Sequence, residues 1–331
     1  MSNSTSAHPL ISVVIPHREG EGIEATLQAL ELAARQNEEA PRTAPLYEVL
    51  AVSGNQPSAQ RNHAVREAAG EFIYFLDNDS IPAEDCFLRI LRFFGEHPGA
   101  AIFGGPSLTP AQDTSWQQAF GAVLGSFFGT AFIRARYRSF GALRATSDRE
   151  LILCNLAMRR RVFLDLGGFD ERLYPNEENA LMDAAVKTGW EIWHDPAFSV
   201  LRSQRPRLSA FIRQLFGYGR GRGEQMRLDP AVNNLVPFVF MLFPLGVLLL
   251  PLILAFVPYA AYAAALYPLI TLFAAFFAWR KGLAVVLYAW ISFFFCHFCY
   301  GCGLWVGLFA PLRSRNVAVR VLLKRYGSGM G

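Results

Sequence analysis

The 331-residue sequence has no apolar segment at its start and almost no charge over residues 233–312. Residues 1–9 are polar and lack the basic region and apolar run of a signal peptide, so we expect the globular part to stay in the cytoplasm. Residues 233–312 contain only two charged side chains, Arg280 and Lys281. This composition excludes a soluble domain in that stretch, because a water-exposed surface carries far more charge.

The sequence also lacks the even number of cysteines that a full set of disulfide pairs needs. Its five cysteines are scattered and odd in number, which argues against a disulfide framework in a cytosolic and membrane chain. Cys296, Cys299 and Cys302 share one side of an expected helix, with His297 among them. A metal or cluster site is one interpretation of this spacing, and we favour the other, close packing of small residues in a membrane helix.

Long apolar runs predict membrane helices. A helix that crosses a bilayer needs roughly 20 predominantly apolar residues, and the apolar run at residues 236–279 is 44 residues long, enough for two crossings. Residues 282–311 supply a third segment. Seven arginines and no lysine lie in residues 202–227, which indicates contact with anionic lipid headgroups or an anionic ligand, a solvated charged face being the alternative. The apolar spacing of residues 208–218 predicts an amphipathic helix at the membrane interface.

Strand and helix patterns alternate ahead of this apolar region. The expected strands cover residues 11–15, 47–52, 72–76, 100–103, 151–157 and 191–193, and the expected helices cover residues 24–36, 57–69 and 177–188. This order predicts an α/β fold with a parallel sheet covered on both faces, whose ligands bind at the carboxyl ends of the strands. The pattern assigns no structure to residues 115–144.

Two carboxylates directly follow the third expected strand. Asp77 and Asp79 stand two positions apart in an Asp-Asn-Asp turn after Phe-Ile-Tyr-Phe-Leu, so both side chains can point to one side. Mg²⁺ and Mn²⁺ prefer oxygen ligands and commonly bridge a protein carboxylate to substrate phosphates. A lone Asp-x-Asp is usually a solvated turn, but its position at the ligand-binding edge of this sheet predicts a site for Mg²⁺ or Mn²⁺.

Four motifs follow one another along the first half of the chain. They are Ile-Ser-Val-Val-Ile-Pro at residues 11–16, Arg-Asn at 61–62, Gly-Glu-Phe-Ile-Tyr-Phe-Leu-Asp-Asn-Asp at 70–79, and Asn-Leu-Ala-Met-Arg-Arg with Gly-Gly-Phe-Asp-Glu at 155–171. Their order and spacing resemble the inverting glycosyltransferases of family 2 over about residues 10–200. The resemblance implies the GT-A fold, a Rossmann-like nucleotide-sugar-binding domain. Gly-Gly-Pro-Ser at 104–107 and a basic helix before C-terminal spans are similar to bacterial exopolysaccharide and surface-polysaccharide members.

The resemblance implies a role for each matching position. Asp77 and Asp79 take the place of the residues that bind the metal and the donor diphosphate, with Asp79 the more direct metal ligand. Arg61 takes the place of a helix residue that contacts the nucleotide, and bracing of the sheet is its alternative role. The loop after the first strand packs near the nucleotide base in the family, which here implies Pro16, His17 and Glu19.

The family also places its catalytic base in an acidic motif at the start of a late helix. The matching residues are Pro-Asn-Glu-Glu-Asn, which makes Glu178 the candidate base and Glu177 its neighbour. Free amides at a helix N-terminus stabilise a carboxylate, and a general base needs only reach and a suitable pKa. The alternative is that both glutamates simply complement the helix dipole.

The chain departs from the family pattern in four ways. Ser53 stands where an aspartate usually contacts the nucleotide base. A serine can form a hydrogen bond with this base but supplies no charge, so the identity of the nucleotide is left open. Ala180 replaces an acidic residue, and Leu201 and Arg202 stand where a histidine is frequent. The Gln-x-x-Arg-Trp signature of processive synthases is missing, which favours transfer of a single sugar.

We therefore predict an inverting, metal-dependent glycosyltransferase that moves a sugar from a nucleotide-diphosphate donor to a hydroxyl of a lipid-linked or polysaccharide acceptor. The alternatives are a polyprenyl-phosphate glycosyltransferase, whose anionic acceptor needs no base, and a non-catalytic membrane subunit with a degenerate sugar-nucleotide domain. The retained Asp77, Asp79 and Glu178 argue against the subunit.

The expected organisation places the enzyme at a bacterial inner membrane, with a cytoplasmic catalytic domain, membrane lipids as partners and no nucleic acid. Its parts are an N-terminal tail (1–9), a GT-A domain (10–203), a basic amphipathic interfacial helix and linker (204–232), a transmembrane region of about three segments (233–312) and a basic tail (313–331). Cationic flanks tend to stay cytoplasmic. We therefore expect a cytoplasmic tail, which requires residues 282–311 to re-enter the membrane rather than cross it.

Overall fold

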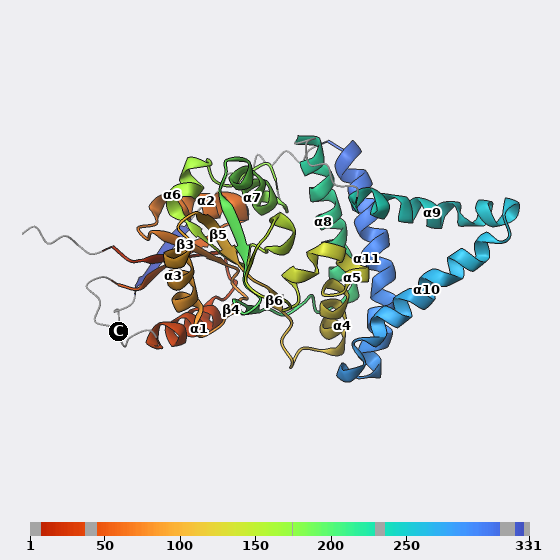
Figure 1. The fold of residues 1–331 in the computed structure, drawn as a ribbon, viewed down its shortest axis with the longest axis horizontal. Coiled ribbons are helices and arrows are strands. Elements are labelled where there is room, and N and C mark those ends of the chain that lie inside the picture. Colours follow the sequence, from red (N-terminus) through yellow and green to blue (C-terminus); the bar gives the residue numbers. More distant parts are fainter. Residues whose placement is uncertain (1–7, 37–44, 174, 229–235, 312–321, 328–331) are drawn as a thin grey trace, which may run out of the picture.

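The computed structural model describes residues 8–36, 45–173, 175–228, 236–311 and 322–327. Within these residues an α/β domain is followed by a group of long helices (Figure 1). The predicted N-terminal tail up to residue 7, and Arg313, Arg315 and Arg320 of the predicted basic tail, lie outside the described residues.

An eight-stranded mixed sheet forms the centre of the α/β domain. Its order is β11 (Leu322–Gly327), β2 (Tyr47–Ser53), β1 (Ile11–His17), β3 (Phe72–Leu76), β8 (Asn155–Arg159), β5 (Ala100–Gly104), β9 (Glu191–His194) and β7 (Arg144–Ala145). β1 runs parallel to β2 and β3, as predicted. The expectation of a wholly parallel sheet is wrong, because β8 runs antiparallel to β3 and β5. No crossover helix returns the chain after β5, so β8 starts at the carboxyl edge and runs back across the sheet.

Helices cover both faces of this sheet. One face is covered by α1 (Glu24–Arg35) and α3 (Cys86–Glu96), the other by α2 (Pro57–Glu67), α6 (Arg160–Asp165) and α7 (Glu177–Lys187). Strands β1 and β3 are buried along almost their whole length, as strands with two covered faces must be. A small second sheet of β4 (Ile81–Pro82), β10 (Val200–Leu201) and β6 (Ser107–Leu108) lies beside the larger one and brings the end of β10 close to the turn after β3.

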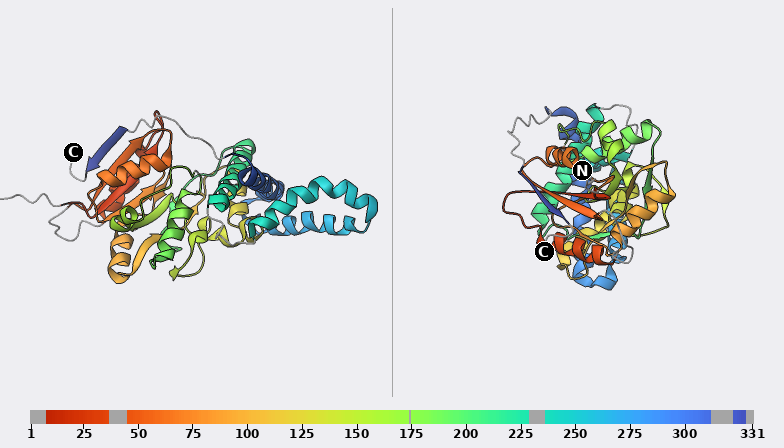
Figure 2. Two further views of the ribbon diagram at one scale, coloured as in Figure 1. Left: turned by 90° about the horizontal axis from the view of Figure 1, so that it is seen from above. Right: turned by 90° about the vertical axis from the view of Figure 1, so that its left-hand side faces the viewer.

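The long helices begin with α8 (Leu208–Leu228), which extends well beyond the predicted interfacial helix and packs along α11 (Leu283–Phe309). Glycines allow this close contact: a Cβ at Gly303 would lie 2.2 Å from the Phe216 carbonyl oxygen. Between them, α9 (Val236–Phe256) and α10 (Ala260–Phe276) form a hairpin that points away from the sheet (Figures 1 and 2). By length and composition α9 and α11 can cross a membrane, and α10 is a shorter apolar helix.

The stretch at residues 115–144 joins the α/β domain to the long helices. It contains α4 (Ser115–Leu124), α5 (Phe127–Thr130) and the 3-10 helix η1 (Ala131–Arg136), which we call the insert. Phe120 of α4 stacks on Phe211 of α8 with ring centroids 4.1 Å apart, and Trp116 stacks on Tyr288 of α11 at 4.0 Å. A separate apolar core therefore forms between the insert and the helices.

The chain returns to the sheet after the long helices. Strand β11 pairs antiparallel with β2, from Leu322 opposite Ser53 to Gly327 opposite Glu48. In Figure 2 this blue strand lies along the red and orange strands of the sheet. Arg325 of β11 also forms an ion pair with Glu48 at 3.1 Å. The end of the described chain is thus part of the α/β domain.

Candidate active site

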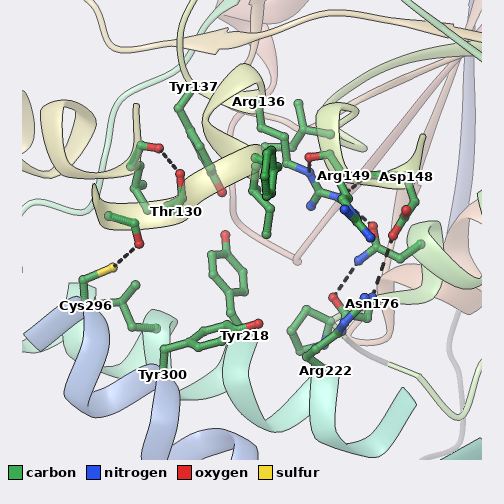
Figure 3. Close-up of a pocket in the computed structure, with 18 of the residues that line it drawn as sticks. Thr130, Arg136, Tyr137, Asp148, Arg149, Asn176, Tyr218, Arg222, Cys296 and Tyr300 are labelled. Carbon is green, nitrogen blue, oxygen red and sulfur yellow. Dashed lines mark hydrogen bonds and ion pairs between the residues drawn. The ribbon is translucent and has the colours of Figure 1, made fainter. Parts of the chain in front are cut away.

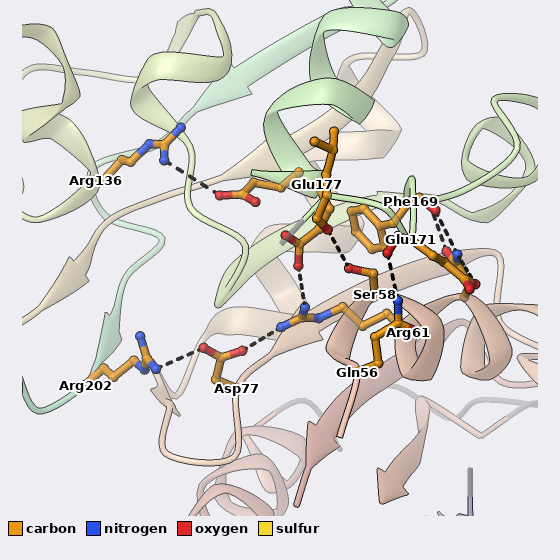
Figure 4. Close-up of polar contacts among 12 residues, drawn as sticks. Gln56, Ser58, Arg61, Asp77, Arg136, Phe169, Glu171, Glu177 and Arg202 are labelled. Atoms are coloured by element: carbon orange, nitrogen blue, oxygen red, sulfur yellow. Dashed lines mark hydrogen bonds and ion pairs between the residues drawn. The ribbon is translucent and has the colours of Figure 1, made fainter. Parts of the chain in front are cut away.

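The acidic turn after β3 is held by arginines on both sides (Figure 4). Arg61 Nη2 lies 2.8 Å from Asp77 Oδ1, and Arg202 Nη2 lies 3.1 Å from Asp77 Oδ2. Arg202 also reaches Asp79, with 2.6 Å between Nε and Oδ1. The buried strand β3 delivers Asp77 to this position, and β10 delivers Arg202. From the sequence, Arg202 is one of the seven arginines in residues 202–227 and stands where a histidine is frequent, and neither observation predicts its contact with the acidic turn.

These arginines keep Asp77 ionised. Burial by itself raises the pKa of Asp77, but the positive charges of Arg202 and Arg61 outweigh burial and hold this pKa below its usual value. The site therefore carries a carboxylate at neutral pH that is already neutralised by protein cations. A negatively charged ligand that approaches this turn therefore meets carboxylates whose charge Arg61 and Arg202 already balance.

The acidic turn fits a divalent cation that is shared with a substrate. Asp77 and Asp79 supply carboxylate oxygens, which hard cations prefer. Across the described ranges no group of three or more histidine, cysteine or acidic side chains could hold an ion by itself. Two protein carboxylates with substrate phosphates and water are a common shell for Mg²⁺. Arg202 contacts one oxygen of each carboxylate, so a cation that uses those two oxygens competes with this side chain.

Arg61 connects the acidic turn to the start of α7. Its side chain is buried, and Nη1 lies 3.2 Å from Oε1 of Glu177 while Nη2 binds Asp77. Burial and the adjacent Glu178 raise the pKa of Glu177, and these effects outweigh the lowering by Arg61. Arg61 thus contacts two carboxylates and joins the acidic turn to the start of α7.

The two glutamates at the start of α7 have different surroundings. The side chain of Glu177 is 2% exposed and bound to Arg61, whereas the side chain of Glu178 is 13% exposed and lines a cavity. Arg136 Nη1 lies 3.8 Å from Glu178 Oε1. The preceding Asn176 has a left-handed backbone with φ 109°, an uncommon conformation that turns the chain into α7. Of the two glutamates, Glu178 is the one that lines this cavity.

The remaining predicted residues gather at the ends of β1 and β2. Pro16 and His17 pair with Val52 and Ser53 in the parallel ladder, so they lie at the same edge as the acidic turn. Glu19 follows in an exposed turn. The structure thus brings Pro16, His17 and Ser53 together and leaves Glu19 at the surface beside them.

A cavity of about 140 Å³ lies between the insert, α7, α8 and α11. Figure 3 shows Arg136, Arg149, Asp148 and Asn176 on one side, Tyr137, Tyr218 and Tyr300 near the middle, and Thr130 and Cys296 on the other side. The sequence motifs include Glu178 and its neighbours Pro175, Asn176 and Asn179, and also Cys296, but they do not predict that these residues line one cavity. Arg136, Arg149, Tyr137 and Tyr300 belong to no motif noted from the sequence, because they come from segments far apart in the chain.

The Cys-x-x-Cys-x-x-Cys motif lies on α11 and has no cluster of ligands around it in the described residues. Cys296 donates to the Gly129 carbonyl oxygen at 3.5 Å, and His297 lies between the Tyr267 hydroxyl at 2.8 Å and the Phe128 carbonyl oxygen at 2.7 Å. These contacts fasten α5 to α11, which agrees with a packing role.

Comparisons with known proteins point to one family. The sequence profile of Glycosyl transferase family 2 matches residues 33–167. The succinoglycan biosynthesis protein ExoA of Rhizobium meliloti (strain 1021) is 27% identical over 218 residues, which are 63% of this chain and 62% of that protein.

Two solved structures are also similar. S. aureus TarS 1–349 has a TM-score of 0.44 and 16% identity, over 66% of this chain and 64% of that chain. Mannosyltransferase PcManGT from Pyrobaculum calidifontis, in complex with GDP-Man and Mn²⁺, has a TM-score of 0.43 and 17% identity, over 67% of this chain and 65% of that chain. The chain thus spans less than two thirds of the length of each of these three relatives.

Proposed function

The chain belongs to glycosyl transferase family 2 through residues 33–167, and on this premise we propose that it is an inverting, metal-dependent glycosyltransferase. It moves a sugar from a nucleotide-diphosphate donor to a hydroxyl of a lipid-linked or polysaccharide acceptor. The observation that carries the proposal is the line of ion pairs from Asp77 through Arg61 to Glu177. This line fixes the acidic turn relative to Glu178, so that a donor group and a base can face one reacting centre.

Each residue has a defined task in this reaction. Asp77 and Asp79 would hold Mg²⁺ or Mn²⁺, which supplies positive charge to the departing nucleotide diphosphate when it is bound. Pro16, His17 and Ser53 border the place for the nucleotide. Glu178 accepts the proton of the acceptor hydroxyl while that oxygen forms its bond to the anomeric carbon, on the face opposite the departing diphosphate.

A role in surface-polysaccharide synthesis is part of the proposal. Its support is the similarity to ExoA, whose name assigns it to succinoglycan biosynthesis. We place the α/β domain on the cytoplasmic side of a bacterial inner membrane, where nucleotide sugars are made. The apolar helices α9 and α11 support membrane attachment.

A polyprenyl-phosphate acceptor is the second candidate. Arg136, Arg149 and Arg222 line the cavity that also holds Glu178, and arginines favour phosphate ligands. A phosphate acceptor is already anionic and needs no base, so loss of the Glu178 carboxylate would then have little effect on transfer.

Binding of the donor tests the proposal directly. The full chain in detergent is heated with Mn²⁺ and either a UDP-, GDP- or dTDP-sugar, because a ligand that binds only the folded state raises its melting temperature. We expect one nucleotide class to stabilise the wild type and not Asp79→Asn, whose melting temperature without ligand stays unchanged. Lack of a shift with every donor would contradict the proposal.

A further inference from the structure

We infer that the cavity between the insert, α7, α8 and α11 binds the acceptor as a sugar joined through phosphate to a long-chain lipid. The inference rests on the proposed function, since it names the acceptor that Glu178 deprotonates. Three features of the cavity carry it: unengaged cationic groups, a middle zone of tyrosines, and an apolar end that continues into the membrane-facing surface.

The cationic groups suit a phosphate. Arg136 is already occupied, because it donates to the backbone oxygens of Arg149 and Asp148 and to Asn179 Oδ1 at 2.6 Å. Arg149, in contrast, makes no side-chain hydrogen bond or ion pair with any residue that the structure describes. Among the described residues, Arg222 has a long contact of 3.8 Å with Asp148 and one hydrogen bond to Gln225. Arg149 and Arg222 therefore retain donors for an anionic ligand.

The side-chain amide of Asn176 is an independent observation that points to a ligand in the cavity. Asn176 is 9% exposed and lines the cavity, and its Nδ2 has no hydrogen-bond partner among the described residues. Leaving a buried donor unpaired costs about 1–3 kcal/mol. The acidic residues that face the same space are Asp148 and Glu178. Because three arginines also face it, the cavity wall keeps a net positive charge that favours phosphate.

The other end of the cavity is apolar and lies beside the membrane-facing helices. Phe132 of η1 and Phe240 of α9 line it, and Phe132 is 56% exposed. Phe127 and Phe128 next to it are also exposed, as are Val239 and Leu242 on α9. A hydrocarbon chain leaving the cavity here enters the same apolar layer as the α9–α10 hairpin. A water-soluble polysaccharide would gain nothing from this apolar exit.

The tyrosines in the middle suit a sugar between the phosphate and Glu178. Tyr137, Tyr218 and Tyr300 turn toward the space in Figure 3, and their rings can pack against a sugar. The Tyr218 hydroxyl already accepts a hydrogen bond from Gln214 Nε2 at 2.6 Å. A lipid-linked sugar can thus place its phosphate at Arg149 and Arg222 and a hydroxyl at Glu178.

A photoreactive lipid phosphate tests this assignment. The full chain in detergent is labelled with benzophenone-tagged farnesyl phosphate, and the labelled residues are mapped by mass spectrometry. We expect labels on η1, α9 or α11, competition by farnesyl phosphate, and no competition by farnesol or inorganic phosphate at equal concentration. Competition by farnesol as strong as that by farnesyl phosphate, or labels confined to the α9–α10 tip, would overturn the inference.

Matched arginine variants make the test specific. Arg149→Ala and Arg222→Ala should each lower labelling about tenfold, the usual effect of losing a charge-assisted hydrogen bond. Arg138→Ala, an exposed arginine of the same region outside the cavity, is the control and should label like the wild type. Arg149→Ala has no partner to lose among the described residues, so it remains informative if Arg222→Ala does not fold. Equal labelling of all three variants would overturn the inference.

Donor binding separates this inference from the proposed function. The same variants are heated with Mn²⁺ and the stabilising nucleotide sugar. If the donor binds and the lipid probe labels other places, the cavity assignment fails and the proposed function stands. If the probe labels the cavity and no nucleotide sugar binds, the lipid site stands and the proposed function fails.

Discussion

Single side chains set the charge of the acidic turn. Arg202 contacts both Asp77 and Asp79, so it competes with any cation for the same oxygens. We expect Arg202→Ala to bind Mn²⁺ about tenfold more tightly without donor, because a charge-assisted contact no longer has to break. Titration followed by electron paramagnetic resonance measures this affinity. Arg207→Ala, outside the turn, is the control, and equal affinities in all three proteins would rule out competition by Arg202.

Glu178 separates the two candidate reactions. Glu178→Gln keeps the shape of the side chain and removes the base, so turnover with a hydroxyl acceptor should fall by roughly two to four decades while donor affinity is nearly unchanged. Glu177→Gln should reduce turnover far less, because Glu177 is bound to Arg61 and buried. Initial rates with a lipid-linked sugar acceptor measure both effects. Rates within a few-fold of the wild type for both variants would favour the polyprenyl-phosphate reaction.

Glu177 also predicts a pH dependence of stability. Its pKa is raised in the folded chain, chiefly by burial and then by Glu178. Its stabilising contribution is therefore fully present below the unfolded pKa of about 4.3 and is lost as the pH rises through the raised value. Melting temperatures between about pH 5 and pH 8 should fall less for Glu177→Gln than for the wild type. Glu31→Gln, an exposed glutamate of α1, should behave like the wild type, and parallel curves for all three proteins would contradict this reasoning.

Among the elements, α8 and α11 depend on contacts between glycines and backbone. Gly219 and Gly223 on α8 and Gly303 and Gly307 on α11 are each spaced four apart, and all four face the partner helix closely. We expect Gly303→Ala to lower the stability of the full chain in detergent by about 1–3 kcal/mol, as overpacking does. Gly246→Ala on α9, where a Cβ meets no atom within 4 Å, is the matched control. Equal thermal unfolding of the two variants would show that α8 and α11 can separate at little cost.

The sequence predicts the elements with strong local patterns. The strands β1, β2 and β3 are predicted correctly, because each is buried on both faces and is therefore apolar along its length. The position of the acidic turn is predicted from the end of β3. Other elements have no such pattern. β11 carries Lys324 and Arg325 on a sheet edge, where polar residues are normal, and its partner β2 lies far away in the sequence. The cavity likewise exists only once the insert, α7, α8 and α11 have packed together, so residue spacing could not reveal it.

At the scale of the whole molecule, β11 bears on the membrane topology. Since β11 pairs with β2, β11 lies on the same side of a membrane as the α/β domain. Both ends of α11 contact groups outside the α9–α10 hairpin: Lys281 at its start binds Gln118 of α4, and the Pro311 oxygen after its end accepts from Arg220 of α8. We therefore expect α9 and α10 to enter the membrane as a hairpin while α11 lies along its surface.

A fused reporter tests this topology. A reporter that is active only in the cytoplasm, joined after Gly331, should be active, because β11 pairs with β2 of the α/β domain. The same reporter placed at the N-terminus marks the side of that domain. Activity at the N-terminus with none at the C-terminus would mean that the chain crosses the membrane an odd number of times and that β11 does not pair in the cell.

The pairing of β2 with β11 also has a consequence during biosynthesis. The ribosome releases β2 long before β11, so the edge of β2 stays open while about 270 further residues, including the apolar helices, are made. An open strand edge invites pairing with other chains. The sheet of the α/β domain is therefore completed only after α9, α10 and α11 have been synthesised, and a chain that stalls within these helices retains an open β2 edge.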